Sequence, residues 1–201
     1  MISVHGFQSR SFSSFNKLQK LVSTNLNFSN ISPSEYYRPG SRKPPQGGDM
    51  AYTEENVKRA ALTFQSIRKV GGSSCTNDMY ARNSASNQFW YIGKVARCDG
   101  TVTLRQAVSK QWNMMEEHAC RLRPIELGRE FGSLEIWAGR GDSELEYSQD
   151  LDNCNLLKMN RFVDVEGVSN KEIGLMLEVV TNEGIGFVIE RDDDGRVVRS
   201  F

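Results

Sequence analysis

Cysteine and histidine are the residues of this chain that could carry nucleophilic, redox or metal chemistry, and they are few. The 201 residues include four cysteines and two histidines. No two cysteines lie within twenty residues of each other, which excludes the CxxC spacing of zinc and dithiol sites; they are Cys75, Cys98, Cys120 and Cys154. Cys75 falls in a predicted polar loop, and exposure there makes it the candidate reactive thiol.

His118 is the one histidine outside the N-terminal segment, and its surroundings do not predict a site. It follows Glu116 and Glu117 on a predicted helix, where adjacent positions point about 100° apart and do not easily chelate one ion. Three positions before it is Met115, so the Glu-x-x-His pair of helical metal sites is missing. G-x-S-x-G and phosphate-loop motifs are also missing. The sequence therefore predicts no catalytic residue, no metal site and no cofactor.

A basic cluster at the end of a predicted helix is the candidate corner for an anion or a protein partner. It consists of Arg121, Arg123 and Arg129. The structural alternative is that these arginines compensate the helix dipole and pair with nearby glutamates.

Three aromatic residues on predicted strands form the second candidate site. They are Trp90, Tyr91 and Trp137. Such rings serve either as core and cross-strand packing or as a binding face that lines a ligand cavity. The sequence leaves both interpretations open.

The elements that must position these side chains follow from apolar periodicity, capping residues and turn signals. Helices are predicted over 53–70 and 103–123, each with an N-capping threonine, and 71–88 is predicted as a polar loop. Alternating apolar residues predict strands over 89–96, 134–138, 157–163, 173–179, 187–189 and 197–198. Hairpin turns are expected at 181–184 and 194–195. This order predicts an α+β fold in which two helices pack on a mostly antiparallel sheet of about five strands.

Charge is unevenly distributed along the chain. Residues 1–48 hold six of the 25 basic residues, one of the 25 acidic residues and ten serines, which leaves 19 basic and 24 acidic residues, a net charge of −5, in 49–201. Such an N-terminus is typical of organelle transit peptides, with an ordinary disordered tail as the alternative. We predict a transit peptide and disordered linker over 1–48 and a single α+β domain over 49–201.

The N-terminal segment favours a plastid over a mitochondrion. It is rich in serine and asparagine, whereas residues 1–12 hold one strong positive charge, too few for a cationic amphipathic presequence. The alternative is import into the mitochondrial matrix with cleavage after Phe12. The first residues lack the apolar region of a secretory signal peptide. The sequence also lacks a run of about 18 apolar residues, so we expect no membrane-spanning helix.

A resemblance to other proteins points to the same compartment. Three stretches between Phe89 and Glu144, FWYIGKVAR, QWNMMEEHACRLRP and LEIWAGRGDSE, resemble uncharacterised plastid-targeted proteins of plants and algae. The resemblance implies a plastid address and no assigned activity.

These patterns favour a role other than catalysis. The net negative charge of 49–201 disfavours nucleic-acid binding. We expect a soluble organellar accessory protein that acts by protein–protein contact, in assembly or stabilisation of a photosynthetic or respiratory complex. The alternative is a small-ligand-binding protein or an enzyme that uses a cavity between the long helix and the sheet. The sequence leaves the oligomeric state open.

Overall fold

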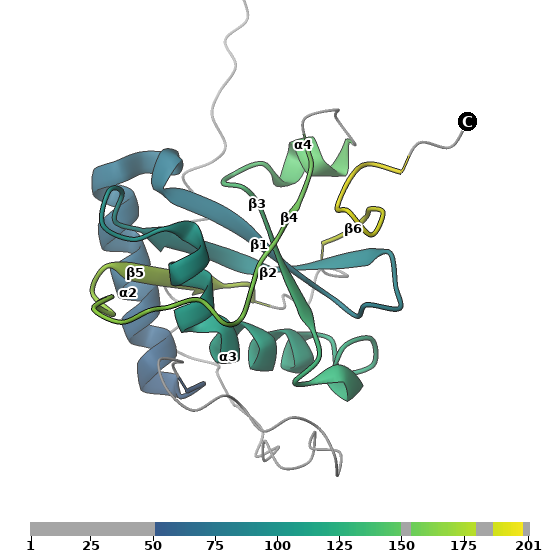
Figure 1. Ribbon diagram of the computed structural model, residues 1–201, viewed down its shortest axis with the longest axis horizontal. Coiled ribbons are helices and arrows are strands. Elements are labelled where there is room, and N and C mark those ends of the chain that lie inside the picture. The colour runs from purple at the N-terminus through teal and green to yellow at the C-terminus, as the bar shows by residue number, and fades with distance from the viewer. Residues whose placement is uncertain (1–50, 150–153, 180–186, 199–201) are drawn as a thin grey trace, which may run out of the picture. The chain divides into compact units, whose positions relative to one another are not determined.

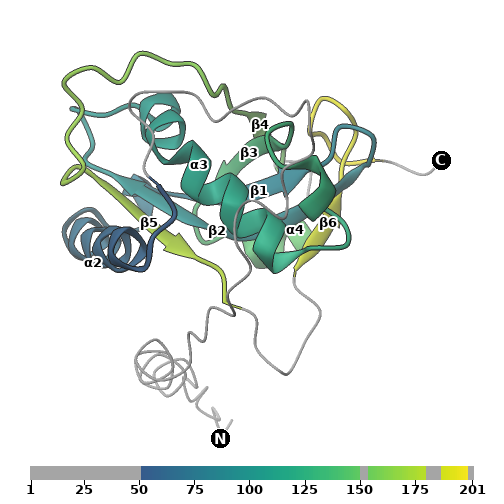
Figure 2. The same ribbon diagram turned by 90° about the horizontal axis from the view of Figure 1, so that it is seen from below.

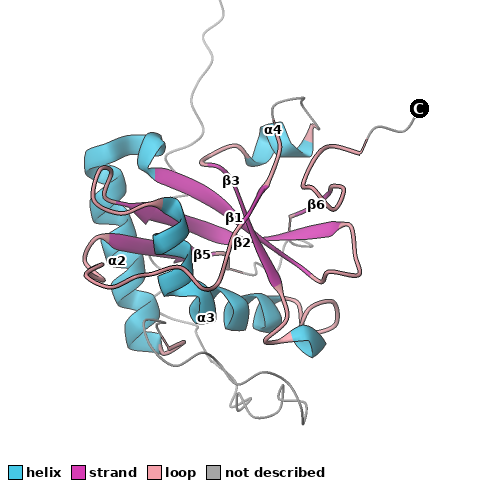
Figure 3. Ribbon diagram, in the orientation of Figure 1, coloured by secondary structure: helices cyan, strands magenta, loops and turns pink. Residues whose placement is uncertain are grey.

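The computed structural model describes residues 51–149, 154–179 and 187–198, which form two long helices and a six-stranded sheet (Figure 1 and Figure 3). The elements in chain order are α2 (Glu54–Gly71), η2 (Gly72–Cys75), β1 (Thr76–Arg82), β2 (Gln88–Arg97), α3 (Leu104–Leu122), η3 (Gly128–Glu130), β3 (Glu135–Arg140), α4 (Glu144–Ser148), β4 (Leu157–Lys158), β5 (Ile173–Leu177) and β6 (Val188–Glu190). The predicted α+β fold is confirmed. The segment 1–48 and the expected turn at 181–184 lie outside the described residues.

Every strand pair in the sheet is antiparallel, and β1 lies at its centre. The strand order is β4-β3-β1-β2-β5, and β6 pairs with β2 on the same side as β5. Backbone hydrogen bonds join Glu178 N–H to Ile92 O at 2.9 Å and Tyr91 N–H to Phe187 O at 3.0 Å. The residues that follow β5 and precede β6 therefore lie opposite neighbouring residues of β2.

The two long helices begin at the caps that the sequence predicts. The Thr53 hydroxyl accepts a hydrogen bond from the third residue of its helix, and Thr103 forms a capping box with Gln106. Figure 2 shows α3 on one side of the sheet and α2 on the other. Gly174 of β5 permits the close approach of α2, because a Cβ there would lie 2.2 Å from the backbone of Phe64.

Buried side chains fill the space between α3 and the sheet. The cluster combines strand and helix residues that are almost entirely inaccessible to solvent, among them Met79, Ile92, Met115 and Ile136. Burial of apolar surface on this scale is the main stabilising contribution in a domain of this size. The opposite face of the sheet carries two smaller clusters, one under α2 and one composed mainly of aromatic rings.

The prediction of a polar loop over 71–88 was wrong, because this stretch contains the central strand β1. Asn77 and Asp78 have low strand propensity, so the segment TNDMYAR resembles a loop by composition. Its polar residues are compatible with burial because partners from distant segments reach them; Arg82, for example, pairs with Glu135 at 2.6 Å.

Two other strand predictions were too long. The strand expected over 157–163 is confined to Leu157–Lys158, and the segment that follows crosses α3, where the Ser109 hydroxyl donates to Arg161 O at 2.5 Å. The strand expected over 197–198 is reduced to a single bridge between Val197 and Arg191. The turn between them is present, with Gly195 at a φ of 78°.

Candidate functional site

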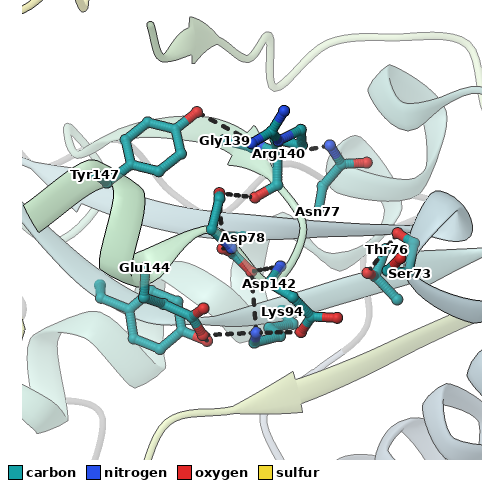
Figure 4. A network of polar contacts seen from close by, with 12 residues as sticks. Ser73, Thr76, Asn77, Asp78, Lys94, Gly139, Arg140, Asp142, Glu144 and Tyr147 are labelled. Atoms are coloured by element: carbon teal, nitrogen blue, oxygen red, sulfur yellow. Dashed lines mark hydrogen bonds and ion pairs between the residues drawn. The ribbon is translucent and has the colours of Figure 1, made fainter. Parts of the chain in front are cut away.

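Lys94 lies at the centre of a charged network on the face of the sheet opposite α3 (Figure 4). It is paired in register with Asp78 of β1, and its Nζ is 3.3 Å from Asp78 Oδ1. After β3 the chain adds two carboxylates, since Asp142 Oδ1 and Glu144 Oε1 each lie 2.6 Å from Nζ. Arg68 of α2 pairs with Asp142 at 2.8 Å. The Lys94 network, as these five residues are called below, thus joins two strands, two helices and a turn.

Asp78 shapes the turn that carries Asp142 and leads into α4, which begins at Glu144. Its side chain is fully buried and accepts hydrogen bonds from the backbone N–H groups of Asp142 (3.2 Å) and Ser143 (3.0 Å) and from the Ser143 hydroxyl (3.3 Å). Asp142 has a φ of 57°, a left-handed conformation that aspartate adopts more readily than most residues. The buried carboxylate therefore stabilises a tight turn as well as the ammonium.

Charge pairing sets the protonation states in this network. Burial raises the pKa of Asp78, with the Ser143 N–H and Lys94 acting in the opposite direction. Burial also opposes the charge of Lys94, but hydrogen bonds to Asp142 and Glu144 outweigh it and raise the Lys94 pKa. Although burial acts to raise the pKa of Asp142, Lys94 holds that pKa below its usual value. Lys94 is therefore a cation at neutral pH, with hydrogen bonds to Asp142 and Glu144 and an ion pair with Asp78.

A cluster of aromatic rings lies beside the Lys94 network. The Tyr91 hydroxyl donates to Glu144 Oε1 at 3.4 Å, and the Tyr80 ring centre lies 5.6 Å from that of Tyr91 and 5.8 Å from that of Tyr147. Burial raises the pKa of both Tyr80 and Tyr91, so both phenols stay protonated. Within the part of the chain that the structure describes, the Tyr80 hydroxyl has no hydrogen-bond partner.

The three aromatic residues considered either as packing or as a binding face do not lie together. Trp90 packs in the cluster under α3, whereas Tyr91 and Trp137 belong to the ring cluster on the opposite face, and all three are at most 8% exposed. The physical reason is strand geometry, because adjacent residues of a strand point to opposite faces. These rings act in packing, and the space where a cavity was considered is filled by side chains such as Met115.

His118 of α3 is held between two neighbouring groups, the Tyr52 hydroxyl and the Glu178 carbonyl. Its Nε2 lies 2.8 Å from Glu178 O, and its Nδ1 lies 3.2 Å from the Tyr52 hydroxyl. Because a carbonyl only accepts, Nε2 carries the proton and Nδ1 accepts from Tyr52. Burial lowers the pKa of His118 to about 4. The ring is therefore neutral near pH 7 and both nitrogens are engaged within the fold.

Cys75 does not lie in an exposed loop. It ends η2, is 2% exposed and packs with Phe64, Ile67 and Ala96. Its thiol donates to Gly72 O, with a sulfur–oxygen distance of 3.1 Å. The exposure that made Cys75 the candidate reactive thiol is thus absent, and its surroundings are those of a structural cysteine.

Arg121, the first member of the predicted arginine corner, is paired. Its Nη2 lies 2.7 Å from Glu117 Oε1, one turn earlier on α3, and its guanidinium lies 4.7 Å from the ring centre of Tyr52. For Arg121 the structural interpretation of the corner, pairing on the helix surface, therefore holds.

Arg123 and Arg129 differ from Arg121 because no ion pair is described for either. The Arg123 guanidinium lies 4.9 Å from the ring centre of Trp90, and its Nη1 donates to Leu122 O at 3.4 Å. Arg129 lies in η3 and is exposed. Among the described residues, no carboxylate lies within ion-pair distance of either guanidinium.

The Lys94 network was missed at the sequence level because β1 resembled a loop. A period-two pattern was nevertheless present, since Met79 and Ala81 alternate with Asp78, Tyr80 and Arg82. That alternation predicts a strand with one apolar and one polar face. The partners of its polar face come from the turn after β3, which no local pattern links to β1.

No family model matches this chain, and no curated protein or solved structure matches it. The described residues contain no group of three or more histidine, cysteine, aspartate and glutamate side chains placed to hold a metal ion. None of the helices in the described ranges is long and apolar enough to cross a membrane. The function must therefore be inferred from the geometry of the chain itself.

Proposed function

We propose that this protein is an organellar accessory protein that acts by protein–protein contact, in assembly or stabilisation of a photosynthetic or respiratory complex. One observation carries the proposal: the side chains best suited to acid–base or nucleophilic chemistry are engaged inside the fold. The Lys94 ammonium forms ion pairs with three carboxylates, and His118 bonds through both ring nitrogens. A catalytic base or nucleophile must instead reach a substrate.

Large apolar side chains at the surface support a contact role. Leu62, Val70, Ile125 and Phe162 are each at least 67% exposed. Single exposed apolar residues are common in monomers, so none of them defines an interface by itself. Together with the internal pairing of the Lys94 network, these exposed side chains support contact with a partner protein better than they support binding of a substrate in a pocket.

The compartment in this proposal comes from the sequence. The acid-poor, serine-rich segment 1–48 supports organelle import, and the resemblance of residues 89–144 to plastid-targeted proteins supports a plastid. Import into a mitochondrion remains the alternative.

The second candidate function is ligand binding or catalysis between α3 and the sheet. It is less well supported, because Ile92, Trp112 and Met115 are buried in that space at no more than 4% exposure. A ligand would have to displace well-packed side chains, at a cost of several kcal/mol.

The proposal is tested by recovering the tagged full-length protein from its own cells. We expect it to co-migrate on a native gel with subunits of one photosynthetic or respiratory complex at a fixed stoichiometry. N-terminal sequencing of the recovered chain separates the compartments, since a start at Ser13 indicates mitochondrial processing and a start between residues 30 and 50 indicates a plastid. A monomer that carries a small molecule would overturn the accessory role.

A further inference from the structure

Arg123 presents a guanidinium that forms no ion pair within the described part of the chain, although it lies close enough to Glu178 to lower the pKa of that carboxyl. Its Cζ lies over the Trp90 ring, 4.9 Å from the ring centre, its Nε is buried without a hydrogen-bond partner among the described residues, and Nη1 makes one long hydrogen bond to Leu122 O. A guanidinium fixed by an aromatic ring loses little further conformational freedom when it binds an anion, and its planar fork matches a carboxylate. Arg123 is therefore prepared to bind a carboxylate group.

The turn that follows α3 connects Arg123 to η3, which contains Arg129. The N–H groups of Leu127 and Gly128 donate to Arg123 O at 2.8 Å and 3.1 Å, so the chain folds back on Arg123. Leu127 is buried, and its carbonyl accepts from the Cys120 thiol at a sulfur–oxygen distance of 3.4 Å. The turn is thus anchored in the core, and η3 with Arg129 begins beside it.

Ile125 lies between the two arginines in this turn and is 86% exposed. Glu126 directly follows Ile125 and is exposed, but no ion pair with a described residue is found for it, so the nearby acidic residues offset the arginines only in part. Glu130 is 3.3 Å from the Ser133 hydroxyl, and Glu178, whose pKa burial raises and Arg123 lowers, forms no described ion pair. An isoleucine between two arginines without ion pairs has the composition of an interface centre, where arginine and apolar anchors are enriched.

We propose that Arg123, Ile125 and Arg129 form the contact surface for an acidic segment of a partner protein. Aspartate or glutamate carboxylates of that segment bind the two guanidinium groups, and an apolar side chain of the segment covers Ile125. The inference rests on the proposed accessory function and specifies where contact is made and with what chemistry. These three residues are called the Arg123 surface below.

A protein segment fits this surface better than a phosphate or a nucleic acid does. A phosphate would pair with the arginines but leave Ile125 exposed, and the net charge of −5 over residues 49–201 repels an extended polyanion. Only a partner with both carboxylates and apolar side chains satisfies all three residues.

Site-specific crosslinking tests the location. Ile125 is replaced by the photoreactive amino acid p-benzoylphenylalanine in the full-length chain, which is added to an extract of its own cells and irradiated. We expect one dominant crosslinked protein whose attachment peptide contains aspartate or glutamate within a few residues of the crosslink. Crosslinking to nucleic acid, to a basic peptide or to no protein while the complex still forms would overturn the inference and leave the proposed function standing. A wild-type chain recovered without any partner would overturn both.

Charge variants test the chemistry. Arg123→Glu and Arg129→Gln are each expected to weaken binding to the crosslinked partner about tenfold, and a carboxylate-to-arginine change in the partner segment is expected to restore binding to Arg123→Glu. Arg105→Gln is the matched control, since Arg105 is an exposed arginine near the start of the same helix. Unchanged binding in Arg129→Gln, which removes no described contact, would contradict the proposal even if Arg123→Glu failed to fold.

Discussion

The Lys94 network and the Arg123 surface both contain positively charged side chains and differ in whether the fold supplies carboxylates to pair with them. In the network, Lys94 lies among three carboxylates that the fold itself supplies. At the surface, Arg123 rests on an aromatic ring and no carboxylate is described within ion-pair distance. Charge that is neutralised within the chain stabilises the fold, whereas charge that is oriented but unpaired is available to a partner. The comparison predicts large stability effects in the network and small ones at the surface.

Replacement of Asp78 by alanine gives the largest expected effect. Two backbone N–H groups of the turn after β3 and the Lys94 ammonium would lose a fully buried acceptor. We expect the free energy of unfolding to fall by about 3–4 kcal/mol, measured by urea denaturation. Asp99→Ala is the control, because this carboxylate is 74% exposed and 3.9 Å from Arg97, and its loss should cost under about 0.5 kcal/mol. Equal losses of free energy in the two variants would show that the buried Asp78 carboxylate contributes no more to stability than an exposed one.

Lowering the pH tests whether His118, which lies near Arg121, is held neutral by the fold. The folded-state pKa of His118 is about 4, below the usual value of about 6.5, so the unfolded chain takes up a proton first as the pH falls. The His118 contribution to stability is complete above about pH 6.5 and declines to about pH 4, by up to about 3 kcal/mol. Urea denaturation across this window should show a steeper decline for wild type than for His118→Gln. Parallel curves would mean that His118 already titrates normally in the folded state.

Removing the Lys94 ammonium should destabilise the fold only at a pH at which the carboxylates of Asp142 and Glu144 are ionised. Lys94→Met is expected to lower the free energy of unfolding by about 2 kcal/mol at pH 7, because Asp142 and Glu144 lose their shared partner. Lys94 lowers the folded-state pKa of Asp142, so the stabilisation is present above the unfolded pKa of about 4 and is lost as the pH falls through the folded value. The gap between variant and wild type should therefore narrow in acid. Lys58→Met, which breaks an exposed pair with Glu54, should show a small, nearly constant difference.

The helices were predictable because their signals are local. Thr53 and Thr103 cap α2 and α3, and each helix has an apolar stripe that faces the sheet. The centre of the sheet was not predictable in the same way. Whether Asp78 and Arg82 are tolerated in a buried strand depends on Ser143 and Glu135, which are more than fifty residues away.

The candidate sites show the same limit. The pairing of Arg121 with Glu117 follows from helical spacing alone, and the sequence offered it as an alternative. Local sequence patterns were insufficient to place Cys75 and the aromatic residues, for different reasons. The loop assigned around Cys75 is a short helix that leads into β1, and Trp90 and Tyr91 are neighbours in a strand, which places them on opposite faces.

The smallest losses of stability are expected for substitutions in the Arg123 surface, and they distinguish this surface from the Lys94 network. Arg123→Gln should lower the free energy of unfolding by about 0.5–1 kcal/mol, the usual contribution of an arginine stacked on an aromatic ring, and Arg129→Gln by less than about 0.5 kcal/mol. Thermal or urea denaturation at two salt concentrations provides the measurement, and neither difference should depend strongly on salt because no described ion pair is removed. A loss of several kcal/mol, or one that disappears at high salt, would place Arg123 in a structural ion pair. Near-neutral stability together with a large loss of partner binding is the combination that a contact surface requires, since its charges then contribute only when the partner is present.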